Sequence, residues 1–365
     1  MTHFIFIFAK KYEMSESFDI RKWFKNPKEL LVISGPCSVE SREQLLETAE
    51  GLSKIQKVKV LRGGIWKPRT RPEAFEGIGE EGLKWMREAK EKFGFLTMTE
   101  VAVPEHVELA LKYGIDVLWL GARTVVNPFS VQELADCLKG CDVPVFVKNP
   151  IAPDLKLWLG AFERLDGAGL KCLGGIHRGF SSYDETPYRN TPVWEIPIEL
   201  KRLRPDIQII TDVSHICGRR DLLQEVAQHA LDFGTIGFMI ESHCNPEKAL
   251  TDANQQITPK SLKNALNTLI VRKTSVDVDD RILKNLRGEI DVIDEEILNL
   301  IAKRMNVSEK IGEFKKEHKV TVLQMDRWKK VLEDHINKGV NLGLSEDLVK
   351  VIFEMIHKES IGRQL

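Results

Sequence analysis

The sequence predicts an α/β protein in which a (β/α)8 barrel is followed by an all-α domain. Between residues 30 and 273, eight short runs rich in β-branched and aromatic residues alternate with amphipathic segments. This alternation is typical of a (β/α)8 (TIM) barrel, whereas a doubly wound open sheet, the alternative, rarely contains eight such units. After residue 273 the apolar residues recur three and four positions apart, which indicates packed helices.

The predicted strands follow one another at regular intervals. The eight runs are LLVISG, VKVLRGG, FLTMTE, DVLWLGA, VPVFVKN, KCLGGIH, IQIITDVSH and TIGFMIE. Segments between them, such as SREQLLETAEGLSKI and RDLLQEVAQHALDFG, place their apolar residues on one helical face, and TPKSLKNALNTLIV predicts the last helix. We therefore expect an N-terminal extension over residues 1–26, the barrel over 27–272, a linker over 273–279 and the helical domain over 280–365.

Composition and charge exclude several classes of function. The 365 residues include 53 Lys+Arg and 54 Asp+Glu, so no global basic field favours nucleic acid. The N-terminal FIFIF is far shorter than the ~20 residues of a membrane span, and no cleavage site of small residues follows it. We interpret it as a loose strand, or as translation upstream of a start at Met14. Six cysteines without a CxxC pair indicate free thiols. We expect a cytoplasmic protein that binds neither nucleic acid nor membrane.

The tail predicts one long helix and two shorter ones. Its apolar seam consists of Leu283, Leu286, Ile290, Ile293, Ile297, Leu300, Val307, Ile311 and Phe314. At 1.5 Å per residue this helix is roughly 50 to 60 Å long, longer than a small domain, so we expect the seam to pack against a second copy of the chain. The polar HKVT ends the helix, and DRWKKVLEDHINKG and SEDLVKVIFEMIHKES predict the other two.

Basic residues gather at the C-terminal ends of the predicted strands, where barrel enzymes place their chemistry. They are Arg62, Lys67 and Arg69 after the second strand, Arg123 after the fourth, Lys148 at the end of the fifth and Arg178 after the sixth. Bringing like charges together costs free energy unless anions bind between them, and arginine suits carboxylate and phosphate oxygens. The pattern therefore predicts a site for two phosphates and a carboxylate.

Candidate metal ligands occupy the same strand ends. Cys37 follows the first strand, His215 the seventh and Glu241 the eighth, and Asp252 lies in the next loop. Sulfur, imidazole and carboxylate ligands together suit Mn²⁺, Fe²⁺, Co²⁺ or Zn²⁺ better than Mg²⁺. Taken alone, Cys37 is better interpreted as a small buried apolar residue, and the spacing of the four positions is weak evidence because they are scattered along the chain.

The motifs GPCS, LRGGIWKPRT, GAR, VKNP, HRG and SHxxGRR, with the spacing from Glu241 to Asp252, resemble 3-deoxy-D-arabino-heptulosonate 7-phosphate (DAHP) synthase of the compact bacterial type I-beta subclass. The resemblance covers residues 27–272 and implies the first reaction of the shikimate pathway. It implies that a divalent metal, with Mn²⁺ favoured, binds Cys37, His215, Glu241 and Asp252. It further implies that phosphoenolpyruvate binds Arg62, Arg123, Lys148 and Arg178, and that the phosphate of erythrose 4-phosphate binds Arg69 and Thr70, with Lys67 near the reacting aldehyde.

The implied reaction is an aldol-like condensation. C3 of phosphoenolpyruvate attacks the aldehyde carbon, water adds at C2, and phosphate leaves by C–O cleavage. The basic residues would align two anions that otherwise repel each other, while the metal polarises the carbonyl. The nearest rival is 3-deoxyoctulosonate 8-phosphate synthase, which uses arabinose 5-phosphate and lacks the KPRT found here. Arg71 stands where relatives commonly carry serine, so we interpret it as a surface charge.

The tail resembles the all-helical chorismate mutase, an intertwined dimer, over residues 280–365. The matching motifs are LRGEIDVIDEEILNLIAKR, IGEFKK, DR at 326–327 and S-x-x-x-Q at 360–364. The resemblance implies that Arg304 and the partner's Arg287 hold the carboxylates of chorismate. It implies that Lys315 and Gln364 donate to its ether oxygen, and that Arg327 and Ser360 complete the site. Gln324 and Trp328 depart from the pattern, because some members carry Asp and Glu there, which contact the substrate hydroxyl.

A noncatalytic sensor of chorismate or prephenate is the alternative for the tail. The presence of both Lys315 and Gln364 favours catalysis, because a sensor has no need of two donors for the ether oxygen. Both roles can coexist in one domain. Residues 1–26 are too few for a separate regulatory domain, so we expect feedback control by prephenate or chorismate to act through the tail. We also expect a homodimer through the helical domain, or a larger assembly built on it.

Overall fold

The computed structural model describes residues 20–23, 29–67, 75–272 and 281–365. The chain divides into two compact units between residues 274 and 275, and each is described by itself. Several predictions fall outside the described residues: the FIFIF run, the linker at 273–279, and the positions of Arg69, Thr70 and Arg71.

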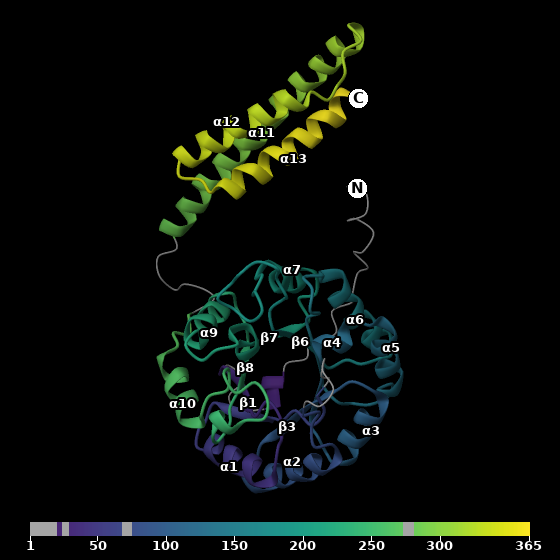
Figure 1. Cartoon of the computed structure of the whole chain (residues 1–365), viewed down its shortest axis with the longest axis vertical. Coiled ribbons are helices and arrows are strands. Elements are labelled where there is room, and N and C mark those ends of the chain that lie inside the picture. Colours follow the sequence, from purple (N-terminus) through teal and green to yellow (C-terminus); the bar gives the residue numbers. More distant parts are fainter. Residues whose placement is uncertain (1–19, 24–28, 68–74, 273–280) are drawn as a thin grey trace. The chain divides into compact units, whose positions relative to one another are not determined.

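The first unit is a closed barrel of eight parallel strands, which confirms the predicted fold (Figure 1). The strands pair in the order of the sequence, and β8 closes the barrel against β1. Their bounds are β1 Leu31–Gly35, β2 Val58–Arg62, β3 Leu96–Val101, β4 Val117–Leu120, β5 Val145–Lys148, β6 Leu173–His177, β7 Gln208–Asp212 and β8 Gly237–Glu241.

Helices surround the barrel (Figure 1). The longer ones are α1 Arg42–Ser53, α2 Glu80–Phe93, α3 Pro104–Lys112, α5 Pro128–Cys137, α6 Leu155–Gly167, α7 Glu195–Leu203, α9 Leu223–Asp232 and α10 Pro259–Thr268. Shorter elements are η1 Ile20–Trp23, α4 Ala122–Val125, α8 Val213–Cys217 and η2 Pro246–Lys248. Several helices begin at polar caps: Ser41 and Thr258, for example, accept hydrogen bonds from the backbone amides of Gln44 and Ser261.

The apolar residues of the barrel form two clusters, because successive side chains of a strand point to opposite faces. Ile33, Val60, Trp119 and Phe146 belong to the cluster inside the barrel, which Ile20 of η1 joins. Their strand neighbours, such as Val32, Leu61 and Leu118, pack outward with the surrounding helices. The interior is therefore a filled core, which leaves the strand ends as the place for a binding site.

Parallel strands bring residues that are distant in sequence to one rim. Arg62, Lys148 and Glu241 are the last residues of β2, β5 and β8. Gly35 at the end of β1 pairs in register with Glu241 at the end of β8, and Cys37 follows two residues later. The closure of the barrel therefore places the first predicted metal ligand beside the third.

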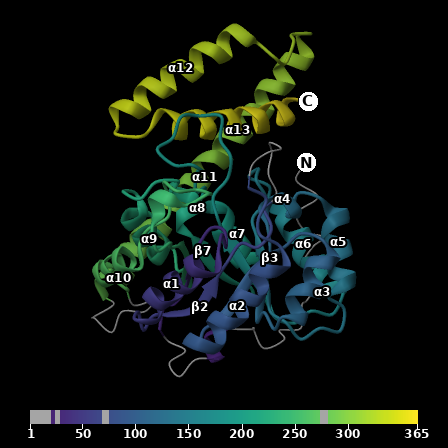
Figure 2. The same cartoon turned by 60° about the horizontal axis from the view of Figure 1, so that its bottom comes forward.

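Over its described residues, 281–365, the second unit contains three helices, α11 Arg281–Glu317, α12 Met325–Asn341 and α13 Glu346–Gln364, in agreement with the prediction (Figure 2). Helix α13 packs against both α11 and α12. A Cβ atom at Gly312 would lie 2.7 Å from the Cα of Gln364, so only glycine allows α11 to approach the end of α13 this closely.

The N-terminal half of α11 carries an exposed apolar face. Leu286, Ile290 and Ile293 are each more than half exposed in the single chain, and Ile297 is 48% exposed. None of the helices among the described residues combines the length and hydropathy that a membrane crossing requires.

Candidate active sites

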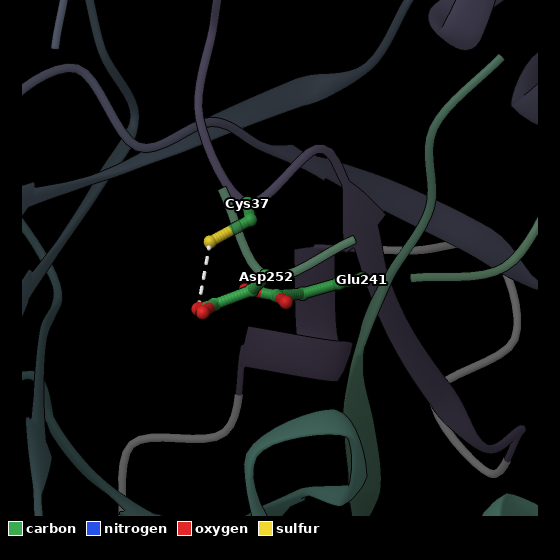
Figure 3. Close-up of side chains that lie close together, drawn as sticks. All are labelled: Cys37, Glu241 and Asp252. Atoms are coloured by element: carbon green, nitrogen blue, oxygen red, sulfur yellow. Dashed lines mark hydrogen bonds between the residues drawn. The ribbon is translucent and has the colours of Figure 1, made fainter. Parts of the chain in front are cut away.

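Three of the four predicted metal ligands come together at the rim of the barrel. One donor atom from each of Cys37, Glu241 and Asp252 lies within 4.8 Å of the other two (Figure 3). The Cys37 thiol donates to Oδ2 of Asp252 over 3.3 Å. Both Cys37 and Glu241 are buried. Asp252 adopts a φ of 50°, a left-handed conformation that is uncommon outside glycine and often occurs at functional sites.

The fourth predicted ligand, His215, lies beside this group. It belongs to the short helix α8, whose N-cap Asp212 accepts hydrogen bonds from the backbone amide of His215 and, over 3.1 Å, pairs with its Nδ1. Nδ1 is 3.8 Å from Oε1 of Glu241. Because Asp212 engages Nδ1, the other ring nitrogen, Nε2, is the one left available to a ligand.

The side chain of Lys67 reaches the same group. Its Nζ donates to Sγ of Cys37 over 3.1 Å. Gly64 makes room for this contact, because a Cβ there would lie 2.7 Å from Cε and Nζ of Lys67 and 2.3 Å from the carbonyl oxygen of Cys37. The residue predicted to lie near the reacting aldehyde thus touches a predicted metal ligand.

The electrostatics of the group fit a bound cation. Burial, reinforced by Glu241, raises the pKa of the Cys37 thiol to about 12. Burial also disfavours charge on both carboxyls, yet His215 with Arg62 lowers the pKa of Glu241, and His215 with Arg189 lowers that of Asp252. Two ionised carboxylates and a thiol therefore face one small volume, and the imidazole of His215 lies beside them. Such a ligand set suits a divalent transition metal.

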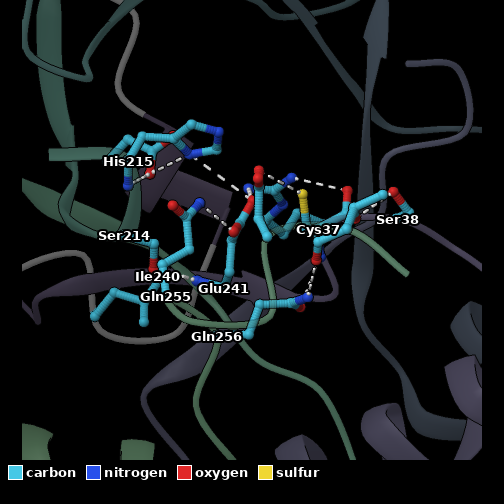
Figure 4. A network of polar contacts seen from close by, with 12 residues as sticks. Cys37, Ser38, Ser214, His215, Ile240, Glu241, Gln255 and Gln256 are labelled. Atoms are coloured by element: carbon cyan, nitrogen blue, oxygen red, sulfur yellow. Dashed lines mark hydrogen bonds and ion pairs between the residues drawn. The ribbon is translucent and has the colours of Figure 1, made fainter. Parts of the chain in front are cut away.

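A hydrogen-bond network holds these ligands in place (Figure 4). Gln255 donates from Nε2 to Oε2 of Glu241 over 2.7 Å, and Oε1 of Gln256 accepts from the backbone amide of Cys37. Nη1 of Arg189 lies 3.1 Å from Oδ1 of Asp252 and 2.5 Å from Oε1 of Gln255. No pattern in the sequence predicts these contacts. Gln255 follows Asp252 closely enough to have been a candidate, but nothing in the sequence marks Arg189, which lies in the long loop after β6.

Two predicted phosphoenolpyruvate residues flank one aromatic ring. The guanidinium carbon of Arg62 lies 5.1 Å from the ring centroid of Trp119, and Nζ of Lys148 lies 5.6 Å from it. Both side chains are buried and ion-paired, Arg62 with Glu241 and Lys148 with Asp212, each at 2.9 Å. These pairs connect the basic residues to the metal-ligand group, since Asp212 also holds His215.

The other two predicted phosphoenolpyruvate residues add further positive charge. Arg178 directly follows β6, and Arg123 lies in α4, directly after β4, with its side chain exposed. Burial, together with repulsion from Arg189 and Arg123, lowers the pKa of Arg178 to about 10. Arg178 is therefore repelled by two neighbouring arginines, and a bound anion would relieve that repulsion.

The helical unit brings four of its predicted residues together in two pairs. Arg304 donates to Oγ of Ser360, and Nζ of Lys315 donates to Oε1 of Gln364 over 3.0 Å. Lys315 also donates to the carbonyl of Val322. The remaining two do not join them within the chain. Arg287 lies in the N-terminal half of α11 and Arg327 lies on α12, and both side chains are exposed.

A barrel that gathers basic residues beside a sulfur, nitrogen and carboxylate ligand set defines an enzyme class that acts on small anionic substrates. The comparison with known families identifies the particular one: the chain belongs to the DAHP synthetase I family, whose model matches residues 22–277. The model of chorismate mutase type II matches residues 286–365. Each of the two predicted domains thus matches the model of an enzyme family.

Individual relatives agree with this assignment. Phospho-2-dehydro-3-deoxyheptonate aldolase of Thermotoga maritima is 35% identical over 226 residues, which are 62% of this chain and 64% of that protein, so the chain spans slightly less than two thirds of its relative. The crystal structure of the Thermotoga DAHP synthase matches with a TM-score of 0.58 and 33% identity, over 65% of this chain and 67% of that one. The 2-dehydro-3-deoxyphosphooctonate aldolase of Wolinella succinogenes is 24% identical over 66% of this chain and 98% of its own length.

Proposed function

We propose that this protein is a bifunctional enzyme of the shikimate pathway. Its barrel, residues 27–272, would condense phosphoenolpyruvate with erythrose 4-phosphate to DAHP and phosphate. Its helical domain, residues 280–365, would rearrange chorismate to prephenate. The observation that carries the proposal is the match of both family models to one chain, each over a unit that gathers basic or hydrogen-bonding residues.

In the barrel, the basic residues would bind and orient the two substrates. Arg62, Lys148, Arg178 and Arg123 would bind phosphoenolpyruvate, and the repulsion of Arg178 by Arg189 and Arg123 supports an anion there. Lys67, with its ammonium group at Cys37, can donate a hydrogen bond to the aldehyde oxygen of the second substrate. C3 of phosphoenolpyruvate then bonds to the aldehyde carbon, water adds at C2, and the C2–O bond to phosphate breaks.

A divalent metal, with Mn²⁺ favoured over Fe²⁺, Co²⁺ or Zn²⁺, would bind Cys37, His215, Glu241 and Asp252. When bound, it supplies Lewis-acid polarisation of the aldehyde carbonyl. The chain's own contribution is to keep the two carboxyls ionised and to fix the His215 ring through Asp212. The thiol would release its proton on binding, because only the thiolate is a strong ligand.

The rival substrate, arabinose 5-phosphate, is distinguished by a direct assay. The purified chain with Mn²⁺ and phosphoenolpyruvate receives either erythrose 4-phosphate or arabinose 5-phosphate, and released phosphate is measured. We expect turnover with erythrose 4-phosphate, because KPRT at 67–70 favours it. Turnover with arabinose 5-phosphate alone would instead assign the chain to the octulosonate reaction.

In the helical domain, the donors would clamp chorismate in its reactive conformer. Arg304 and the partner's Arg287 would hold the two carboxylates, with Arg327 and Ser360 completing the site. Lys315 and Gln364 would donate to the ether oxygen, where negative charge develops. The exposed apolar face of α11 supports a homodimer through this domain, or a larger assembly, because burying that face in a second copy removes it from water.

The tail can also regulate the barrel. We propose that prephenate or chorismate, bound in the helical domain, lowers synthase activity. The test compares the response of the synthase to prephenate in the full chain, in the full chain carrying Arg304→Ala, and in a chain that ends at residue 272. We expect only the unaltered chain to respond. Equal inhibition of all three would exclude regulation through the tail.

We propose a cytoplasmic location. All six cysteines are free thiols, which fits a reducing compartment.

A further inference from the structure

His357 is a polar residue of the helical unit that the proposed function does not use. It lies on α13 and stacks on Trp328 of α12, with the ring centroids 3.7 Å apart and the planes 5° from parallel. Its Nε2 is buried and has no hydrogen-bond partner among the described residues. A buried polar atom without a partner is unfavourable, so a ligand that supplies the missing hydrogen bond would bind more tightly for that reason.

The position of His357 on α13 places it in the proposed mutase site. Ser360 and Gln364 follow it by three and seven residues, so the three side chains share one face of the helix. Ser360 contacts Arg304, and Gln364 contacts Lys315. Burial lowers the pKa of His357, and the charges of Arg304 and Lys315 lower it further. The imidazole is therefore neutral at pH 7 and can form one hydrogen bond through Nε2.

The polar groups of chorismate can be matched to donors one by one, and this step rests on the proposed function. The arginines would bind the two carboxylates, and Lys315 and Gln364 would donate to the ether oxygen. The ring hydroxyl is then the one polar group of chorismate without an assigned partner. Trp328 offers no acceptor to it, and its ring face is occupied by the imidazole of His357. The side chain of Gln324 is exposed.

We propose that Nε2 of His357 forms the hydrogen bond to the ring hydroxyl of chorismate, and that Trp328 holds the imidazole in position for it. His357 is then a specificity-determining residue of the mutase site. The pair Trp328 and His357 replaces, on two helices, the carboxylate that the resemblance places at position 328. The loss of that carboxylate and the unpartnered nitrogen thus have one explanation.

The test is a comparison of two substrates in two variants. His357→Phe keeps an aromatic ring for the stack on Trp328 but removes the nitrogen. His335→Phe is the matched control, because His335 also contacts an aromatic ring, Phe353, at 4.0 Å within the same unit. The rate constant kcat/KM is measured with chorismate and with its analogue that lacks the ring hydroxyl.

We expect the unaltered full-length protein and His335→Phe to prefer chorismate by roughly tenfold, the effect of one hydrogen bond. In His357→Phe, kcat/KM should fall about tenfold with chorismate and change little with the analogue, so that the preference for chorismate disappears. His357→Gln, which restores a polar group, should regain part of it. If His357→Phe retains the preference, or loses both substrates equally, the inference is wrong. If the unaltered protein converts neither substrate, the proposed mutase function is wrong, and this inference with it.

Discussion

Lys67 and Cys37, thirty residues apart, meet at the rim of the barrel, where Nζ of Lys67 donates to Sγ of Cys37 over 3.1 Å. The contact exists because β1 and β2 are neighbours and because Gly64 leaves space for the lysine side chain. It joins the basic residues to the metal-ligand group. The ammonium group that would face the aldehyde and the thiol that would bind the metal therefore act at one place.

Replacing Cys37 by serine should remove most synthase activity. Serine keeps the size of the side chain but is a much poorer ligand for a transition metal, so we expect a loss of about 100-fold or more in turnover with Mn²⁺, and less bound metal. Cys172→Ser is the control, since Cys172 directly precedes β6 and lies at the opposite end of the barrel. Full turnover by Cys37→Ser would show that Cys37 is not a ligand.

Replacing Lys315 by alanine should abolish the mutase activity and spare the basal synthase activity. Loss of one preorganised donor at a developing negative charge lowers kcat by about 10² to 10³. Lys316→Ala is the matched control, because the neighbouring lysine is exposed. Chorismate consumption is the readout. Normal consumption by Lys315→Ala would leave the tail as a sensor without catalysis.

A charge on the exposed face of α11 should disrupt the assembly. Ile290→Glu places a carboxylate where we expect a dimer interface, so the mass of the assembly in solution should fall and chorismate turnover should be lost with the partner's Arg287. Asn299→Glu adds the same charge on the opposite face of the helix from Ile290, so it should change neither the mass of the assembly nor chorismate turnover. A light-scattering measurement reports the mass against 41.6 kDa for one chain. Unchanged mass together with unchanged turnover would exclude an interface on this face.

The buried imidazole of His177 should make the protein less stable at acid pH. Burial lowers the pKa of His177 from 6.5 to about 4, so the unfolded chain binds a proton below pH 6.5 that the folded chain does not. Stability is therefore lost as the pH falls from 6.5 towards 4. This residue alone should lower the free energy of unfolding by about 2 kcal/mol between pH 7 and pH 5.

The check is urea unfolding at pH 7 and pH 5. His177→Gln keeps a donor for the carbonyl of Pro192, which His177 contacts at 2.6 Å, but does not titrate. We expect His177→Gln to remove the fall of about 2 kcal/mol in the free energy of unfolding between pH 7 and pH 5. His318→Gln, at an exposed position, should retain that fall. Equal pH dependence in His177→Gln and the unaltered protein would mean that His177 is not the cause.

The repeating parts of the structure were predictable from the sequence, since each strand and helix has its own local pattern. The order of the strands, the placement of Arg62, Lys148 and Glu241 at strand ends, and the long helix α11 all follow from such patterns. Arg189 was not predictable, because it reaches Asp252 from a loop whose path depends on the whole barrel. The proposed role of His357 was not predictable for a related reason, because it depends on the stack with Trp328 on another helix.

The most direct test of the central claim is a paired assay on one preparation of the full-length chain. Loss of phosphoenolpyruvate is followed with erythrose 4-phosphate and Mn²⁺, and loss of chorismate is followed in parallel, each with and without a metal chelator. We predict that both activities are present and that the chelator abolishes only the first, because the rearrangement needs no metal. Absence of the first activity after metal addition would contradict the account, as would a synthase that the chelator leaves unaffected.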